Sequence, residues 1–195
     1  MQPHPPRIPK DGGEWNTLKL SQMQNPKADR VLRALLFLSF VAFLFVIKDS
    51  FRERIVEAGD DAPNFTVTTD TGRTITRTDF GGRVLVLNFF ASWCEPCIQE
   101  LPSLDEFARA TKDSGVVVLG VSIDKNEGAY KDFVRKFSPA FPTVRDPEAN
   151  IPTEFGTFMW PETYVIDRTG KVVRKEIGPK NWMDPQLVNS IRAIS

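Results

Sequence analysis

The sequence predicts an α/β domain that is preceded by a single transmembrane helix. Residues 31–47 are almost entirely apolar and have the composition of a membrane segment. The runs at 83–90 and 116–123 are apolar on both faces and of strand length, as in the centre of a covered sheet. Between them, residues 96–112 place apolar side chains at helical spacing. A strand, a helix and a strand in this order indicate a right-handed parallel crossover, and therefore an α/β fold.

The membrane segment follows a polar tail of residues 1–30, which is rich in Pro and Gly and is expected to be a flexible cytoplasmic tail. The uninterrupted apolar part, residues 34–47, is shorter than the roughly 20 residues that span a bilayer. A cleaved signal peptide is therefore an alternative to a membrane anchor. The long preceding tail and the lack of a small-x-small cleavage site after residue 47 favour an uncleaved signal anchor.

Basic residues predict the orientation of this anchor. Six Lys or Arg residues lie before the apolar segment or close to its start, at positions 7–33. Three lie just after it, at positions 48–54. Because the more basic flank stays inside, the tail is expected in the cytoplasm. Residues 48–58 then form a charged juxtamembrane stalk. Residues 59–195 form the folded domain on the extracytoplasmic (periplasmic) side of a bacterial cytoplasmic membrane.

Composition excludes several functional classes. The 25 Lys and Arg residues balance 25 Asp and Glu residues, and no basic stripe carries interleaved aromatics, so no nucleic-acid partner is expected. The only histidine, His4, lies in the tail, which leaves the domain without a histidine for a catalytic triad or a metal site. The only two cysteines, Cys94 and Cys97, cannot form a disulfide-stapled scaffold or a four-cysteine zinc site.

Alternating β-branched residues, amphipathic spacing and turn residues predict the remaining elements. Asp184, followed by Pro185, has the pattern of an N-cap and the first helical position. A Pro-rich region separates the second helix from the second hairpin. The expected elements are a hairpin of residues 65–69 and 73–76, a helix at 128–137, a hairpin of 162–167 and 171–176, and a helix at 184–194.

The segment FFASWCEPCIQELP places Cys94 and Cys97 three positions apart, where a central strand ends and a helix begins. Free N–H groups and the helix dipole at this position stabilise a thiolate. Cys94 is therefore the expected nucleophile. Cys97, further into the helix and expected to be more buried, is the resolving thiol that attacks a mixed disulfide on Cys94. Pro96 fits the first helical turn and stiffens the loop.

An isolated C-x-x-C pair also occurs as an inert disulfide or as half of a metal site. The core strand before the pair, the flanking Trp93 and the amphipathic helix after it favour a redox function.

From about Gly59 to its C-terminus the sequence resembles the thioredoxin superfamily, specifically the membrane-anchored TlpA-like branch that includes the reductases of cytochrome c maturation. The resemblance is carried by GDDAPNF, WCEPC, FPTVRDPE and WPETYVIDRTGKV. It implies a thioredoxin-like three-layer α/β/α sandwich with a mixed central sheet and an N-terminal β-hairpin extension. It also implies that the redox-active disulfide of Cys94 and Cys97 works without a further cofactor.

In this family a cis-proline lies beside the two cysteines, and the matching position here is Pro161. It would present the backbone of Trp160, which is larger than the residue usual there, as an extended edge for a client segment. Glu95 is expected to be exposed and to disfavour the thiolate. The substrate-binding residues that follow from the sequence are Trp93, Glu95, Pro96, Trp160 and Pro161.

An acidic residue on the active-site helix of the family matches Glu100. A carboxyl near the sulfurs would exchange a proton with the resolving thiol and, while ionised, raise its pKa. A solvated carboxylate on the helix face is the alternative. The expected catalytic residues are thus Cys94, Cys97 and Glu100.

The sequence predicts a membrane-tethered thiol-disulfide oxidoreductase. The resemblance implies a reductase whose clients are protein disulfides, such as those of apocytochrome c, and which a membrane thiol-electron carrier re-reduces. The residues themselves leave the direction of electron flow open, since a reductase in an oxidising compartment needs electrons delivered across the membrane.

Two other functions fit the same fold less well. A peroxiredoxin-like thiol peroxidase would need a hydroxyl three residues before its cysteine, where this sequence has Ala91 before Cys94. A metal-binding module, such as a copper carrier, would need a histidine within the domain, and His4 lies outside it.

Overall fold

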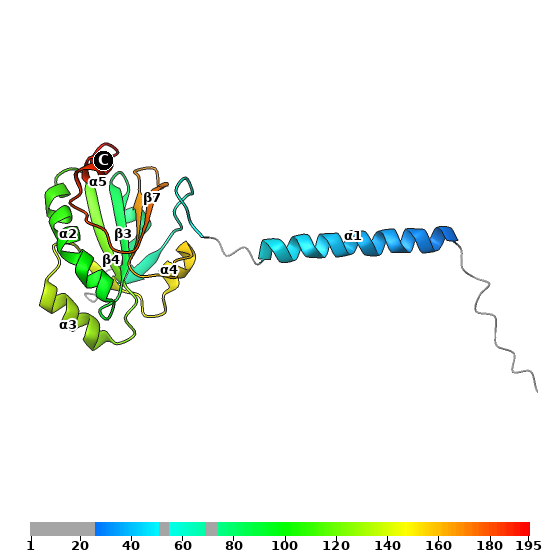
Figure 1. Cartoon of the computed structure of the whole chain (residues 1–195), viewed down its shortest axis with the longest axis horizontal. Coiled ribbons are helices and arrows are strands. Elements are labelled where there is room, and N and C mark those ends of the chain that lie inside the picture. The colour runs from blue at the N-terminus through cyan, green and yellow to red at the C-terminus, as the bar shows by residue number, and fades with distance from the viewer. Residues whose placement is uncertain (1–25, 51–54, 69–73) are drawn as a thin grey trace, which may run out of the picture. The chain divides into compact units, whose positions relative to one another are not determined.

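The computed structural model describes residues 26–50, 55–68 and 74–195 (Figure 1). The expected tail, apart from residues 26–30, and the turn of the first expected hairpin lie outside the described residues, as do residues 51–54 of the expected stalk. The chain divides into two units, one containing helix α1 and the other all remaining elements.

Helix α1 (Pro26–Ser50) contains the apolar run and extends beyond it at both ends. Its stretch Arg30–Ile47 has a mean hydropathy of 2.3 over 18 residues, long and apolar enough to cross a membrane, and none of it is buried within the structure. Large apolar side chains exposed along a whole helix are stable in lipid rather than in water. This is one candidate membrane span, and an N-terminal signal sequence satisfies the same criterion.

The second unit is built on a five-stranded sheet with the order β5-β4-β3-β6-β7. The central strand β3 runs parallel to β4 and antiparallel to β6, and every residue of β3 is buried. This mixed sheet with buried central strands confirms the thioredoxin-like α/β fold. The five strands are β3 (Val84–Phe90), β4 (Val116–Ser122), β5 (Thr143–Arg145), β6 (Glu162–Ile166) and β7 (Val172–Ile177).

Side chains alternate across the sheet and build a core on each face. Val84 and Val86 of β3 pack with apolar residues of α2 and α5, and Phe90 packs with Phe133 of α3. Leu85 and Leu87 point the other way, toward α4 and an N-terminal hairpin. The helices of the first face are α2 (Glu95–Thr111), α3 (Glu127–Phe137) and α5 (Pro185–Arg192). The second face is covered by β1 (Thr66–Thr68), β2 (Thr74–Thr76), the 3-10 helix η2 (Arg77–Phe80) and α4 (Asn150–Phe155).

Both hairpins and the C-terminal helix expected from the sequence are present. Strands β1 and β2 pair antiparallel, as do β6 and β7. The Asp184 carboxylate caps α5 by accepting hydrogen bonds from the N–H groups of Gln186 at 2.9 Å and Leu187 at 3.1 Å. Three short elements were not predicted: β5, α4 and η2.

The segment just before residue 59 packs against the domain, although the sequence predicted a stalk there. Val56 is 4% exposed and belongs to the apolar core of the second face. Its N–H donates a hydrogen bond of 3.0 Å to the carbonyl of Phe155. The packed part of the chain therefore includes Val56.

Candidate active site

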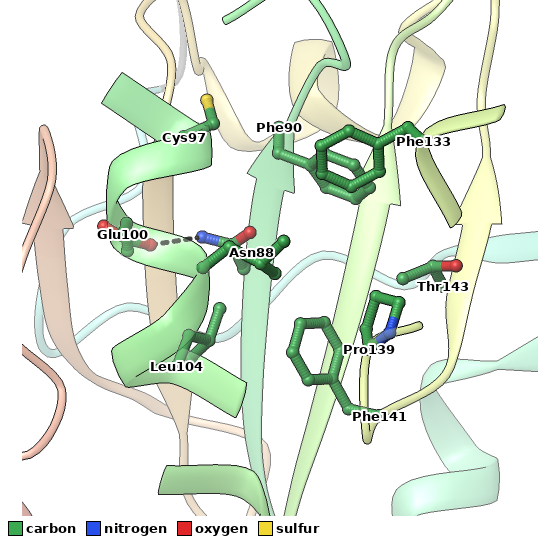
Figure 2. Close-up of a pocket in the computed structure, with 10 residues that line it drawn as sticks. Asn88, Phe90, Cys97, Glu100, Leu104, Phe133, Pro139, Phe141 and Thr143 are labelled. Atoms are coloured by element: carbon green, nitrogen blue, oxygen red, sulfur yellow. Dashed lines mark hydrogen bonds between the residues drawn. The ribbon is translucent and has the colours of Figure 1, made fainter. Parts of the chain in front are cut away.

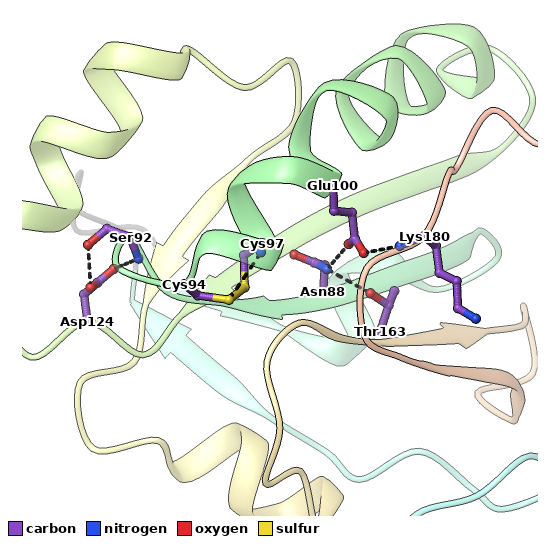
Figure 3. Close-up of a disulfide and its surroundings, with 8 residues drawn as sticks. All are labelled: Asn88, Ser92, Cys94, Cys97, Glu100, Asp124, Thr163 and Lys180. Carbon is purple, nitrogen blue, oxygen red and sulfur yellow. Dashed lines mark hydrogen bonds between the residues drawn. A yellow bond between two sulfur atoms is a disulfide. The ribbon is translucent and has the colours of Figure 1, made fainter.

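Cys94 and Cys97 form a disulfide with an S–S distance of 2.07 Å at the start of α2 (Figure 3). Cys94 is the N-cap of this helix, and its Sγ accepts a hydrogen bond of 3.3 Å from the N–H of Cys97. N–H groups in the first helical turn have no partner within the helix. The same N–H and the helix dipole would therefore stabilise a thiolate on Cys94 after reduction.

The expectation that Cys97 is more buried than Cys94 is wrong for this oxidised form. Each cysteine is 5% exposed. The disulfide holds both sulfurs against one apolar cluster, to which Phe90 and Tyr130 also belong. The asymmetry between the two cysteines lies in the capping hydrogen bond, which only the Cys94 sulfur accepts.

Three of the expected substrate-binding residues surround Cys94 on the surface. The side chain of Trp93 is 66% exposed, and Glu95 and Pro96 are exposed as well. Their position next to the disulfide is compatible with contact to an incoming polypeptide.

The other two expected substrate-binding residues lie directly before strand β6. The Trp160–Pro161 peptide bond is cis, as the resemblance implied. Trp160 is partly buried and packs against the cluster that contains both cysteines. Pro161 is buried, and its carbonyl accepts a hydrogen bond of 2.9 Å from the N–H of Gly178. The fold thus brings this loop to the disulfide from a distant part of the chain.

Glu100 lies one turn after Cys97 and is only 3% exposed, so the alternative of a solvated carboxylate is wrong. Its Oε1 accepts a hydrogen bond of 2.9 Å from Nδ2 of Asn88, and its Oε2 accepts one of 2.9 Å from the N–H of Lys180 (Figure 3). Asn88 also donates to Oγ1 of Thr163 at 2.8 Å. A buried polar chain therefore joins α2 to strands β3 and β6.

Burial raises the pKa of Glu100 to about 6, even though the N–H of Lys180, the Trp182 indole and the Asn88 amide lower it. A carboxyl with this pKa is protonated in an appreciable fraction of molecules near neutral pH. It is therefore able to take up or release a proton during a reaction.

Glu100 and Cys97 both line one small cavity (Figure 2). Asn88 lines it as well, together with apolar side chains that include Phe90 and Phe133. Its volume is about 10 Å³, close to the smallest space that admits a water molecule. Cys97 and Glu100 thus line the same small cavity.

Asp124, which the sequence reasoning missed, holds the loop that leads to Cys94. It is 2% exposed, follows β4, and accepts hydrogen bonds from the N–H of Ser92 at 2.9 Å and from the Ser92 hydroxyl at 2.7 Å. The hydroxyl of Ser122 donates a third, at 2.6 Å. The one sequence signal for this role is Ser122-x-Asp124 at the end of a buried strand. Ser and Asp side chains at such positions commonly form hydrogen bonds with nearby backbone groups.

Comparisons with known proteins agree with this site. A family model described as the AhpC/TSA family matches residues 58–175. The thiol-disulfide oxidoreductase ResA of Bacillus thuringiensis subsp. konkukian is 33% identical over 146 residues, which cover 75% of this chain and 84% of that protein. ResA of Bacillus subtilis strain 168 is 31% identical over 123 residues, covering 63% and 69%.

Solved structures give the same result. The crystal structure of a thiol:disulfide interchange protein DsbE from Chlorobium tepidum superposes with a TM-score of 0.66 at 31% identity. The match covers 71% of this chain and 98% of that one. The solution structure of a protein disulfide isomerase from Bacteroides thetaiotaomicron has a TM-score of 0.64 at 27% identity, covering 72% and 91%.

Proposed function

Since the chain belongs to the AhpC/TSA family and is one of its thiol-disulfide oxidoreductases, we propose that it works as a membrane-tethered reductase of client protein disulfides. The observation that carries this proposal is the Cys94–Cys97 disulfide at the start of α2, with Trp160 of the cis Trp160–Pro161 bond packed against the same apolar cluster and the buried Glu100 one turn further along the helix. The cysteine pair itself carries the electrons.

The first step is attack by the Cys94 thiolate on one sulfur of the client disulfide. A bond forms between Cys94 and that sulfur, the client S–S bond breaks, and the second client sulfur leaves as a thiolate that takes a proton from water. The N–H of Cys97 and the helix dipole favour the attacking thiolate.

In the second step Cys97 loses its proton and attacks the sulfur of Cys94. The Cys94–Cys97 disulfide forms and the mixed disulfide breaks, releasing the remaining client sulfur as a thiolate. Glu100, in its ionised form, is the proposed acceptor of the Cys97 proton, because both residues line one small cavity and the Glu100 pKa of about 6 suits proton exchange. Two electrons have then passed from this protein to the client.

The client segment is proposed to lie between Trp93 and the Trp160–Pro161 edge, with Glu95 and Pro96 at its border. The exposed Trp93 supplies apolar contact, and the backbone before Pro161 is proposed to offer hydrogen-bonding groups to a polypeptide. Such contacts orient the client sulfur toward Cys94.

Helix α1 is proposed to be an uncleaved anchor in a bacterial cytoplasmic membrane, with the N-terminus in the cytoplasm and the domain in the periplasm. A membrane thiol-electron carrier would re-reduce the disulfide, and apocytochrome c is the proposed client. Tethering raises the effective concentration of the domain near a membrane-bound partner.

The reductase activity is tested with the reduced full chain in detergent and an oxidised peptide that carries the Cys-x-x-Cys-His sequence of a c-type haem site. We expect one peptide disulfide to be reduced for each Cys94–Cys97 disulfide formed, and Cys94→Ala to abolish the reaction. A wild-type chain that leaves the peptide oxidised contradicts the proposal. Consumption of hydrogen peroxide in preference to the peptide would instead support the peroxidase alternative.

The orientation is tested in spheroplasts that express the chain with an N-terminal epitope. External protease should degrade the domain and leave the epitope intact. Loss of the epitope with survival of the domain would reverse the proposed topology.

A further inference from the structure

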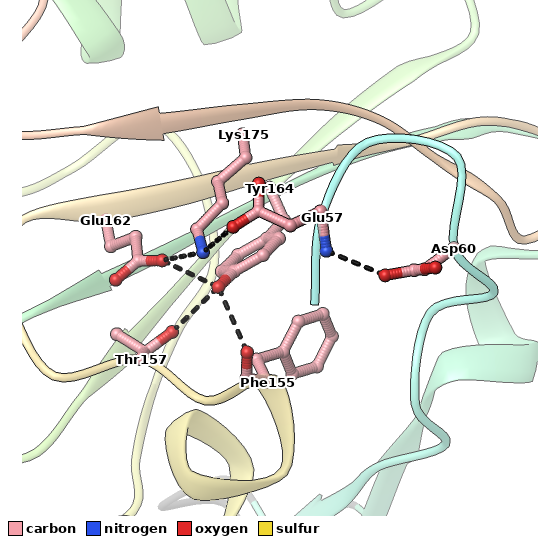
Figure 4. Close-up of polar contacts among 7 residues, drawn as sticks. All are labelled: Glu57, Asp60, Phe155, Thr157, Glu162, Tyr164 and Lys175. Atoms are coloured by element: carbon pink, nitrogen blue, oxygen red, sulfur yellow. Dashed lines mark hydrogen bonds and ion pairs between the residues drawn. The ribbon is translucent and has the colours of Figure 1, made fainter. Parts of the chain in front are cut away.

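A second buried polar cluster, drawn in Figure 4, surrounds Tyr164, which belongs to the core of the second face of the sheet. Glu162 and Tyr164 of β6 alternate with Thr163, the residue that contacts Asn88 on the first face, so their side chains point to the other side. Lys175 of the neighbouring strand β7 completes the group, which we term the Lys175 cluster. The mechanism above uses none of these three side chains.

The ammonium of Lys175 is held between two carboxylates. Its side chain is 5% exposed, and Nζ lies 3.2 Å from Oε1 of Glu162 and 3.1 Å from Oε1 of Glu57. The Glu162 side chain is 1% exposed. The ammonium also lies 5.5 Å from the centre of the Tyr164 ring, a distance that permits a cation–π contact. A buried charge is tolerated only with such partners, so Lys175 and Glu162 depend on each other.

Tyr164 extends this cluster to the start of a loop. Burial, and then the hydrogen bond to Glu162, raise the pKa of the Tyr164 hydroxyl well above its ordinary value, so the hydroxyl keeps its proton. It donates that proton to Oε1 of Glu162 at 2.6 Å. The hydroxyl of Thr157 therefore acts as the donor in its 3.2 Å contact with the Tyr164 oxygen.

These contacts fix both ends of the loop of residues 157–161. Thr157 is its first residue, and Glu162 directly follows its last residue, Pro161. Between them the loop exposes Phe158 by 67% and Met159 by 48%, while Trp160 packs against the disulfide cluster. Any shift of Glu162 would move Pro161, and with it the edge proposed to receive the client.

We propose that Lys175 is a positioning residue for polypeptide clients. By fixing Glu162, it keeps the loop of residues 157–161 in its position next to the disulfide. This inference rests on the reductase function proposed above. A small disulfide that reaches Cys94 without touching the loop would depend on Lys175 much less than a polypeptide does. Glu57, in the segment that follows helix α1, is the second carboxylate that keeps the ammonium in place.

The test compares two probes that release the same coloured thiol. One is bis(thionitrobenzoate) disulfide, and the other is a short apolar peptide whose single cysteine is joined to thionitrobenzoate. In the full chain with Cys97→Ala, the Cys94 thiolate attacks the disulfide sulfur, one S–S bond replaces another, and thionitrobenzoate leaves as the thiolate. The measured quantity is the rate constant for the peptide divided by that for the small disulfide.

We expect Lys175→Met to lower this ratio about tenfold, as misplacement of a positioning element commonly does. Lys175→Arg keeps the positive charge and should restore most of the ratio. Lys171→Met is the matched control, because Lys171 lies just before β7 with its side chain 54% exposed, and it should leave the ratio unchanged. If Lys175→Met leaves this ratio unchanged, the inference is overturned. An equal slowing with both probes is such a result, because it does not alter the ratio.

A second variant keeps the test valid if Lys175→Met fails to fold. The double variant Glu162→Gln, Lys175→Met leaves no buried charge unpaired. Its ratio should still be about tenfold lower than that of the chain with both residues intact. A wild-type ratio in this double variant would show that the ion pair does not position the loop. If the chain with Lys175 intact reacts with neither probe, the reductase proposal itself has failed. A normal reaction with an unaltered ratio contradicts the role of Lys175 alone.

Discussion

Asn88 and Glu100 are joined by a hydrogen bond of 2.9 Å, from the amide Nδ2 of Asn88 to the carboxylate Oε1 of Glu100. This bond connects the central strand β3 to the active-site helix one turn beyond Cys97. It keeps the Glu100 carboxyl buried where its pKa is raised, beside the cavity that Cys97 lines.

The stability of the oxidised protein should depend on the protonation of Glu100. Its pKa in the folded protein, about 6, is above the ordinary value of 4.5, so folding favours the protonated form. The stabilisation is complete below pH 4.5 and is lost as the pH rises through about 6. Relative to Glu100→Gln, the wild type should lose about 2 kcal/mol of unfolding free energy over this range. Urea denaturation followed by Trp fluorescence measures it, and a difference that does not vary with pH would contradict the assignment.

The two cysteines should differ in trapping. Cys97→Ala should accumulate a mixed disulfide with an oxidised client, because Cys94 attacks first and no resolving thiol remains. Cys94→Ala should accumulate none. Non-reducing gel electrophoresis followed by mass spectrometry identifies the adduct, and the opposite pattern would reverse the two roles.

Asp124→Ala should destabilise the oxidised protein by about 2–4 kcal/mol, because it leaves the partly buried Ser92 N–H and the buried Ser122 hydroxyl without their acceptor. Asp132→Ala is the matched control, since the Asp132 side chain is 72% exposed and its loss should change stability little. Denaturant unfolding of both variants measures the difference. Equal stability of the two would mean that Asp124 does not anchor the loop.

Val56→Ala should lower the unfolding free energy by about 1–3 kcal/mol, because Val56 is part of the apolar core. The neighbouring Ile55 is 43% exposed, and Ile55→Ala should have little effect. The same unfolding measurement compares the two variants. If Val56→Ala is as stable as Ile55→Ala, the packed domain begins later in the chain.

The central strands and the long helices were predictable because their patterns are local. Strand β3 is apolar at nearly every position, and α2 repeats apolar residues at helical spacing. Strand β5 has only three residues and depends on pairing with β4. Helix α4 has six residues, and its N-cap makes no side-chain hydrogen bond, so neither element leaves a periodic signal.

Some residues of the site could likewise be predicted from the sequence, and others could not. Cys94 and Cys97 are visible from their spacing, and Pro161 from a family resemblance. The partners of Glu100 are not visible, because Lys180 lies 80 positions further along the chain. Lys175 was missed because a strand residue flanked by charges is normally solvated, and only the fold places it between two carboxylates.

The reduction potential of the Cys94–Cys97 couple tests the proposed direction of electron flow most directly. It is measured on the full chain in detergent by equilibration with defined ratios of reduced and oxidised glutathione or dithiothreitol, with the thiols then trapped and counted. We expect a reducing couple, closer to thioredoxin at about −270 mV than to the disulfide-forming DsbA at about −120 mV. A potential near about −120 mV would contradict the reductase function.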